Sequence, residues 1–206
     1  MTGSLYVKAT LRQLSFLAAF AMVAGLASSA RALTQCMDEK TFKHVVNKNF
    51  AAVPQATGFN NHMGSLLTES PTMMSWVMQA AMLRGQYFVD SRTSAMSVAM
   101  QEAERRGINT ISRDVFLDYE DNAATVEKQI KLLVKKAKQR GYALGIGHPY
   151  PDTLATLEKW LPIIEQQGIK VVPVSRLIEA RHQYVKRKQH DKYSLKNSSD
   201  STGARM

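Results

Sequence analysis

Apolar residues along this chain alternate between helical spacing and short continuous runs. The helical pattern is clearest over residues 123–140, where every third or fourth residue is apolar and the opposite face carries lysines. The runs of four to six residues between these segments are typical of buried strands. We predict helices at residues 38–50, 71–84, 94–106, 123–140, 153–167 and 175–184, and strands at 56–60, 87–90, 109–111, 142–146 and 169–174.

The order of these elements predicts the fold class. Strand and helix alternate with short loops between them, which is typical of an α/β protein with a parallel sheet or a barrel. The five predicted strands suffice for an open sheet, whereas a closed barrel needs about eight. Ser70 and Pro71 form a helix start, with a capping hydroxyl followed by proline at the first helical position. The methionines that follow are spaced as core residues.

Composition narrows the chemistry that the chain can support. A length of 206 residues fits one domain with appendages. The single cysteine, Cys36, excludes an intramolecular disulfide and a cysteine-rich zinc site. Any bound metal must therefore use histidine, aspartate or glutamate.

The formal net charge of +10 is concentrated at the C-terminal end, because residues 181–206 hold seven Lys/Arg and two Asp/Glu. We predict that 181–206 form a basic, disordered tail that is solvated and can contact anionic lipid or an acidic polymer weakly. The charge excess lies in a low-complexity segment with only two aromatic residues, Tyr184 and Tyr193, so the segment does not favour a nucleic-acid partner.

The N-terminal residues resemble an export signal. Lys8 and Arg12 precede an apolar stretch at residues 14–26, and Ala30-Arg31-Ala32 offers a cleavage site after Ala32. The stretch is short for a membrane span, which needs about 20 residues. We predict that residues 1–32 are a cleavable signal peptide or, alternatively, a retained anchor, which would be the chain's only membrane attachment. Residues 33–180 then form an exported domain of the periplasm or cell envelope.

Candidate site residues lie in loops that directly follow the predicted strands. In parallel α/β folds the carboxyl ends of strands meet at one edge, where such proteins place their chemistry. Four successive loops have this pattern, so we expect one assembled site. Its candidates are Asn60, Asn61, His62, Ser65 and Thr68, then Asp90 and Arg92, then Arg113 and Asp114, and finally His148 and Tyr150.

The two loop histidines are the strongest candidates. His62 lies in a loop with little apolar mass to bury it, and Pro149 and Pro151 stiffen the turn that holds His148. His44, His182 and His190 lie in a helix or in the basic tail and are incidental.

The neighbouring charged residues allow two interpretations. Asp90 with Arg92, and Arg113 with Asp114, are either structural ion pairs or groups that orient a carboxylate, which in turn fixes a histidine tautomer. The sequence has no glycine-rich phosphate loop, no Gly-x-Ser-x-Gly elbow and no His-Glu-x-x-His motif. Ser65 and Ser91 lack any local feature of an activated nucleophile.

Four of these segments together resemble the divergent polysaccharide deacetylases, bacterial envelope proteins related to the NodB-type carbohydrate esterases. The segments are Asn-Asn-His-Met-Gly-Ser at 60–65 with Thr68, Val-Asp-Ser-Arg-Thr-Ser at 89–94, Ser-Arg-Asp-Val-Phe-Leu-Asp at 112–118, and Gly-His-Pro-Tyr-Pro-Asp-Thr-Leu at 147–154. They follow the family's order and spacing from about Leu33 to Leu177.

The resemblance implies a distorted (β/α) barrel of the glycoside hydrolase–deacetylase type, a divalent metal, usually zinc, and hydrolysis of N- or O-acetyl groups on an envelope polysaccharide or peptidoglycan-type glycan. His62 would be a metal ligand, and His148 a catalytic acid or a second metal ligand. Asp90, Arg92, Arg113 and Asp114 would shape and polarise the site. Asn60, Asn61, Ser65, Thr68 and Tyr150 would line it.

The sequence departs from the family pattern in one respect. Family members carry an upstream Asp-Asp pair that supplies a base and a metal ligand, and no Asp-Asp occurs in this chain. We therefore expect the C-terminal part of a deacetylase-like domain, with about five strand–helix units of the barrel. Three hypotheses follow: a metal-dependent hydrolase, a carbohydrate-binding protein without catalysis, or a vestigial fragment that folds poorly.

Overall fold

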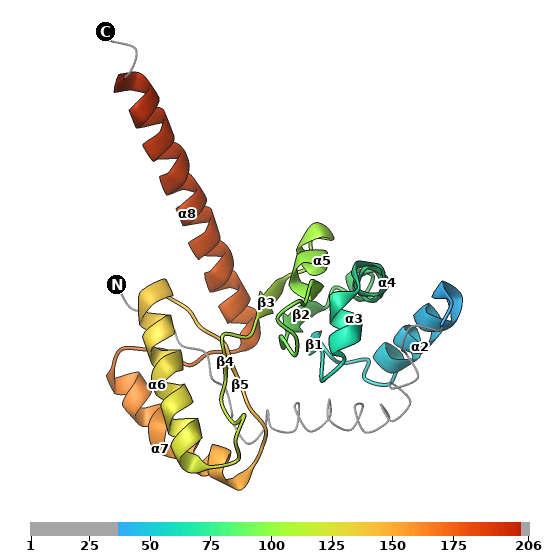
Figure 1. The fold of residues 1–206 in the computed structure, drawn as a ribbon, viewed down its shortest axis with the longest axis horizontal. Helices are drawn as coiled ribbons and strands as arrows, with labels where there is room; N and C mark the ends of the chain where they lie inside the picture. The colour runs from blue at the N-terminus through green and yellow to red at the C-terminus, as the bar shows by residue number, and fades with distance from the viewer. Residues whose placement is uncertain (1–36, 203–206) are drawn as a thin grey trace.

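The computed structural model describes residues 37–202, with side chains up to residue 191 (Figure 1). The predicted signal or anchor at residues 1–32 lies outside this range. Seven helices and five short strands follow one another along the described part of the chain. In order they are α2 (Glu39–Ala51), β1 (Gly58–Asn60), α3 (Ser65–Glu69), α4 (Pro71–Met82), β2 (Tyr87–Asp90), α5 (Ala99–Arg105), β3 (Thr110–Ser112), β4 (Val115–Phe116), α6 (Ala123–Arg140), β5 (Gly145–Ile146), α7 (Pro151–Gln166) and α8 (Val174–Thr202).

The strands form two small parallel sheets. β1, β2 and β3 pair in that order, with Phe59 opposite Phe88 and Val89 opposite Ile111. β4 pairs with β5 as a separate two-stranded sheet. Since every pairing is parallel, all strand ends that precede the candidate loops point in the same sense within their sheet. The α/β prediction is confirmed, and the described residues form open sheets rather than a closed barrel.

Helices bury the apolar residues of both sheets. The largest buried side chains of α2, α4 and β2, among them Phe42, Met74, Met78 and Phe88, share one core cluster. This cluster confirms the core position of Met74 and Met78, whereas Met82 at the end of α4 is 46% exposed and lies outside the core. A second cluster joins α6 and α7 to β4, and a third packs Leu177 of α8 against the strand residues Val89 and Ile111.

Most predicted elements occur close to their predicted positions. α6 has the predicted bounds, and Gly141 ends it with a left-handed φ of 82°. α5 begins at Ala99 rather than at residue 94, because serine side chains of the preceding loop bind Asp90 and Glu69. The strand predicted at 169–174 is reduced to a single bridge residue, Lys170. The short elements α3 and β4 were not predicted.

The prediction of a disordered tail at residues 181–206 is wrong as far as Thr202, because α8 continues to that residue. No glycine or proline interrupts residues 174–202, so nothing in the backbone ends the helix earlier. Its first turns are anchored: Leu177 and Ile178 are buried, and Arg181 binds Glu104 and the carbonyl oxygen of Thr110. No described helix combines the length and apolar character needed to cross a membrane.

The N-terminus of α6 offers a direct test of local stability. The Asn122 side chain accepts a hydrogen bond of 2.8 Å from the backbone N–H of Thr125, which would otherwise lack a helical partner. We expect Asn122→Ala to lower the free energy of unfolding by about 1 kcal/mol, and Asn122→Ser to retain most of it. Urea unfolding followed by circular dichroism measures both. Equal stability of the alanine and wild-type proteins would contradict the capping role.

Candidate functional site

The fold brings the two candidate histidines together. His62 follows β1 of one sheet, and His148 follows β5 of the other. Their ring centroids are 6.1 Å apart, and the rings are nearly perpendicular at 81°. His62 is exposed, whereas the side chain of His148 is only 34% exposed. The structure thus joins the first and last of the four predicted loops at one place.

A buried carboxylate that sequence reasoning did not select orients His148. Asp118 follows β4, and its side chain is fully buried. Its Oδ1 lies 3.1 Å from His148 Nδ1, and its Oδ2 accepts the backbone N–H of His148 and, at 3.0 Å, the hydroxyl of Thr153. The hydrogen-bond network assigns the hydrogen to Nδ1, so Nε2 is left as an acceptor for chemistry. Such a carboxylate–histidine pair serves proton transfer or metal ligation.

Gly147 allows this contact to form. A Cβ atom at residue 147 would lie 3.2 Å from Asp118 Oδ2 and 3.3 Å from Leu117 Cβ. These distances are tighter than ordinary van der Waals contact, so a side chain at this position would push the His148 loop away from the carboxylate. A sequence signal for Asp118 was present. Val115-Phe116-Leu117-Asp118 repeats the pattern of Tyr87-Phe88-Val89-Asp90, an apolar strand that ends in aspartate.

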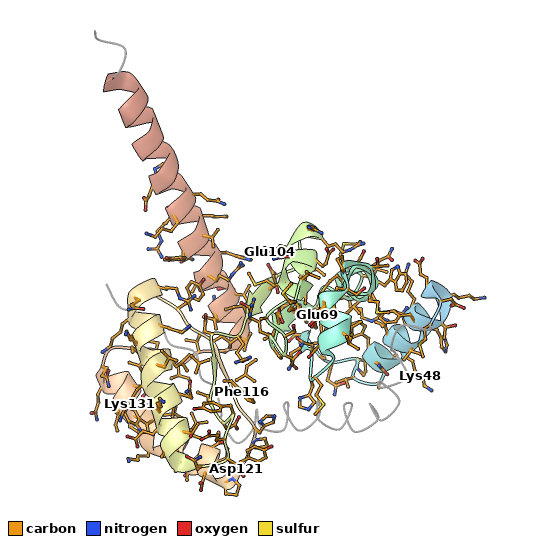
Figure 2. All side chains as sticks on the ribbon, viewed as in Figure 1. Lys48, Glu69, Glu104, Phe116, Asp121 and Lys131 are labelled. Carbon is orange, nitrogen blue, oxygen red and sulfur yellow. The ribbon has the colours of Figure 1, made fainter. Side chains whose placement is uncertain are left out.

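Aromatic rings flank His148. The Tyr150 ring lies 5.0 Å from the imidazole, tilted by 30°, and the Phe116 ring lies 5.6 Å away in an edge-on arrangement (Figure 2 labels Phe116). Tyr150 remains 39% exposed, so one side of the ring pair faces solvent. Pro151 begins α7 immediately after Tyr150 and fixes the direction of the loop. This arrangement presents a flat apolar surface beside an ionisable group.

Asn60 and Asn61 hold the His62 loop against the loop after β2. The Asn60 side-chain amide donates to Ser91 Oγ at 3.0 Å, and Asn61 Oδ1 accepts the backbone N–H of Ser91 at 2.8 Å. The Asn61 amide also reaches Thr93 Oγ1 at 3.4 Å. Both asparagines therefore position the loop that carries His62.

Ser65 and Thr68 form hydrogen bonds that hold the same loops together. Thr68 is fully buried, donates its hydroxyl to the carbonyl of Ser65 at 3.0 Å, and accepts the backbone N–H of Val98. The Ser65 hydroxyl donates to the carbonyl of Thr93 at 3.4 Å.

Met63, between the loop and α3, has a positive φ of 59°, which is rare for a residue with a side chain. Such local strain is found mainly where the surrounding structure fixes a functional loop.

Asp90 organises the loop after β2 and does not reach the histidines. Its fully buried carboxylate accepts the backbone N–H of Arg92 at 2.8 Å and the hydroxyl of Ser97 at 2.9 Å. Arg92 consequently adopts a left-handed φ of 47°, and its guanidinium donates to the carbonyl of Ala95. Asp90 contacts the backbone of Arg92 and not its guanidinium.

Arg113 and Asp114 are directed to different parts of the fold. Arg113 donates to the carbonyl oxygens of Ser91 at 2.6 Å and Arg92 at 2.9 Å, and its guanidinium lies 5.1 Å from the Phe116 ring. Burial lowers the pKa of Arg113, the charge of Arg92 lowers it further, and Asp90 opposes both effects.

Asp114 instead accepts the backbone N–H of Leu144 at 2.8 Å and pairs with Arg140 of α6. The Arg113–Asp114 pair considered from the sequence is therefore replaced by an Arg140–Asp114 pair. This pair ties α6 to the strand region, apart from His62 and His148.

The described side chains around His62 and His148 offer fewer donors than a zinc ion needs. Catalytic zinc sites use three protein ligands and leave a fourth position open. Within residues 37–202, no group of three or more histidine, cysteine, aspartate and glutamate side chains is arranged to hold a metal. His62 and His148 provide two imidazoles, and Asp118 is already engaged with His148, Thr153 and the local backbone. These residues do not by themselves complete a metal site.

Comparison with known proteins identifies the family. The model of the divergent polysaccharide deacetylase family matches residues 24–178, which is more than half of the chain. An uncharacterized protein of Haemophilus influenzae is 40% identical over 116 residues, covering 56% of this chain and 41% of that protein. The uncharacterized protein YibQ of Escherichia coli K12 is 36% identical over 123 residues, covering 60% of this chain and 39% of YibQ.

A solved structure shares the fold. The crystal structure of an uncharacterized protein from Agrobacterium tumefaciens C58 superimposes with a TM-score of 0.62 at 25% identity, covering 66% of this chain and 56% of that protein. The chain spans about two fifths of the length of the curated relatives it matches. The residues that the family model matches, 24–178, include all four candidate loops. The chain belongs to the divergent polysaccharide deacetylase family.

Proposed function

We propose that this protein takes part in hydrolysis of acetyl groups on a sugar polymer, with His148 as the residue that transfers protons. One observation carries the proposal: the buried carboxylate of Asp118 fixes the His148 imidazole through Nδ1. An imidazole fixed in this way can use Nε2 as an acid or a base near neutral pH. Family membership supplies the reaction class.

The proposed proton transfers use both ring nitrogens of His148. His148 Nε2 takes a proton from the water that attacks the acyl carbon, and the imidazolium returns it to the leaving amine or alkoxide. Asp118 stabilises the imidazolium between these steps, because the ionised carboxylate accepts its Nδ1–H. His62, at a ring distance of 6.1 Å, is placed to bind an oxygen of the substrate.

The aromatic residues suit a carbohydrate ligand. Sugar rings present flat faces of C–H groups, which pack against exposed aromatic rings. Tyr150 lies beside His148 and is 39% exposed, so a sugar bound to it would place its substituents near the imidazole. The proposed substrate is an envelope polysaccharide or a peptidoglycan-type glycan, and the proposed location is the periplasm or cell envelope.

The proposal includes a closed (β/α) barrel and a bound zinc ion only if residues outside the described range contribute to the site. The described residues form open sheets, and the candidate site supplies two imidazoles, those of His62 and His148. A third ligand and the remaining strands would come from outside them. No step assigned to His148 depends on such a metal.

A second candidate function is glycan binding without turnover. It is favoured by the incomplete metal donor set, because the aromatic and asparagine residues of the histidine loops keep their positions without a metal. This function predicts that the protein retains acetylated glycan and releases no acetate.

Acetate release from O-acetylated xylan and N-acetylated chito-oligosaccharide tests the proposal. We expect His148→Gln to lower the rate by about 10²- to 10⁴-fold, the usual contribution of a positioned acid–base group. His44→Gln is the matched control, since His44 is exposed on α2 and should leave the rate unchanged. Equal rates for wild-type and His148→Gln proteins would overturn the role of His148. Binding of both glycans without acetate release by the wild-type protein would support the second function.

A further inference from the structure

The basic residues of the C-terminal helix α8 are concentrated in one segment outside the histidine loops. From Arg181 to Asp191, α8 holds four Lys/Arg residues and one aspartate. Figure 1 shows that the helix leaves the body after its first turns and extends beyond it. Residues 186–191 are all exposed, whereas Arg181, His182, Tyr184 and Val185 are half-buried where the helix leaves the body.

A shallow, largely open cavity lies where α8 meets the body. It has a volume of about 330 Å³ and is lined by Glu104, Arg181, His182, Val185 and Lys186. Glu104, labelled in Figure 2, pairs with Arg181 and leaves the charge of Lys186 uncompensated at the cavity. Burial lowers the pKa of His182, and the charges of Arg181 and Lys186 lower it further, whereas Glu104 raises it. Arg181 and Lys186 thus bring two positive charges to the cavity and Glu104 brings one negative charge, which leaves a net positive charge that attracts an anion.

The next turn of α8 carries further positively charged side chains. Lys186, Arg187 and Lys188 are exposed, and none of them forms an ion pair with an acidic side chain in the described part of the chain. Lys188 lies 6.0 Å from the ring of Tyr184, and Arg187 donates to the carbonyl of Gln183 within the helix. Three consecutive residues on a helix point in directions about 100° apart, so these cations surround the helix rather than forming one stripe.

We propose that the base and exposed turn of α8, comprising Arg181, His182, Lys186, Arg187 and Lys188, form a binding site for an acidic polysaccharide, with one anionic group of the polymer in the cavity. The inference is independent of catalysis at His148, because none of these residues lies in the histidine loops. The site would hold an anionic glycan on the protein while the histidine loops remain accessible.

The structure favours a flexible acidic polymer over a lipid bilayer or a nucleic acid. A helix that lies on a membrane needs an apolar face opposite its basic face. Among residues 185–191, Val185 is the one aliphatic residue, and it lines the cavity. Binding of single-stranded nucleic acid needs exposed aromatic rings for stacking. Tyr184, the aromatic residue in this part of α8, packs on Tyr142 with ring centroids 5.5 Å apart.

The test uses polygalacturonate, a carboxylated glycan, and measures its affinity for the full chain at low and high salt. We expect the triple variant Lys186→Gln/Arg187→Gln/Lys188→Gln to lose about tenfold in affinity at low salt, since each exposed ionic contact contributes about a factor of two. The wild-type affinity should fall as the salt concentration rises. The affinity for neutral xylan should depend neither on the salt concentration nor on the triple substitution.

A charge-matched control variant separates a site from general attraction. Lys128→Gln/Lys135→Gln/Lys136→Gln removes the same charge from α6 and should change the affinity by less than about twofold. Equal losses in the two variants, or no loss in the α8 variant, would overturn the proposal. Tighter binding of phosphatidylglycerol vesicles or duplex DNA than of polygalacturonate would overturn the choice of a glycan. Retention of polygalacturonate by His148→Gln would show that this site is separate from the proposed catalytic one.

Discussion

Replacing Asp118 with asparagine is expected to lower acetate release by about 10²- to 10⁴-fold while the protein remains folded. The carboxylate is fully buried and takes three hydrogen bonds from two residues, His148 and Thr153. Asparagine has nearly the same volume, and its carbonyl oxygen can keep the contacts of Oδ2. Its amide group would then face His148 Nδ1 and donate to it. The imidazole would carry its hydrogen on Nε2 and could no longer act as a base there.

The measurement is kcat/KM for acetate release as a function of pH, together with thermal unfolding of each variant. Asp114→Asn is the matched control, because Asp114 belongs to the same loop region but pairs with Arg140 and the backbone of Leu144. It should reduce stability without a comparable loss of rate. If Asp118→Asn and Asp114→Asn reduce the rate equally, orientation of His148 by Asp118 is not a catalytic requirement.

Replacing Phe88 with alanine is expected to cost about 3–5 kcal/mol of unfolding free energy, the usual range for removal of a buried phenylalanine. Phe88 is fully buried on β2, the central strand of the three-stranded sheet. Its ring centroid lies 5.0 Å from that of Phe59 on the neighbouring strand. The cavity left behind would lie between the sheet and the helices that cover it, where rigid elements on both sides limit collapse.

Urea unfolding measures this loss, and a fall of roughly 6–20 °C in Tm should accompany it for a chain of this size. Phe88→Leu fills most of the space and should lose clearly less. A loss below about 1 kcal/mol for the alanine variant would mean that the three-stranded sheet is not packed as described. Because β2 ends at Asp90, the alanine variant should also loosen the loops at the strand ends.

Sequence patterns located most helices because a long amphipathic helix repeats its signal over several turns. α6 shows this: its apolar face, the Asn122 cap and the Gly141 end all predict the same bounds. β4 has only two residues, Val115 and Phe116, and was missed because so short a run carries no periodicity. The end of α8 was misjudged because its charge indicated disorder, whereas the absence of helix breakers and its anchored first turns support a helix.

For the candidate site as well, some features could be predicted from the sequence and others could not. The sequence alone indicated His62 and His148, since each follows a strand and lies in a small-residue loop. It also indicated the family, because four ordered motifs occur at the family's spacing. Only the tertiary structure decided which carboxylate serves the histidine. Asp90 ends β2, whereas Asp114 and Asp118 follow β3 and β4. Asp90 binds Arg92 and Ser97 of its own loop, Asp114 binds Arg140 and the backbone of Leu144, and Asp118 binds His148. Local pattern determines where a loop begins, and the packing of one strand end against another determines which side chains meet.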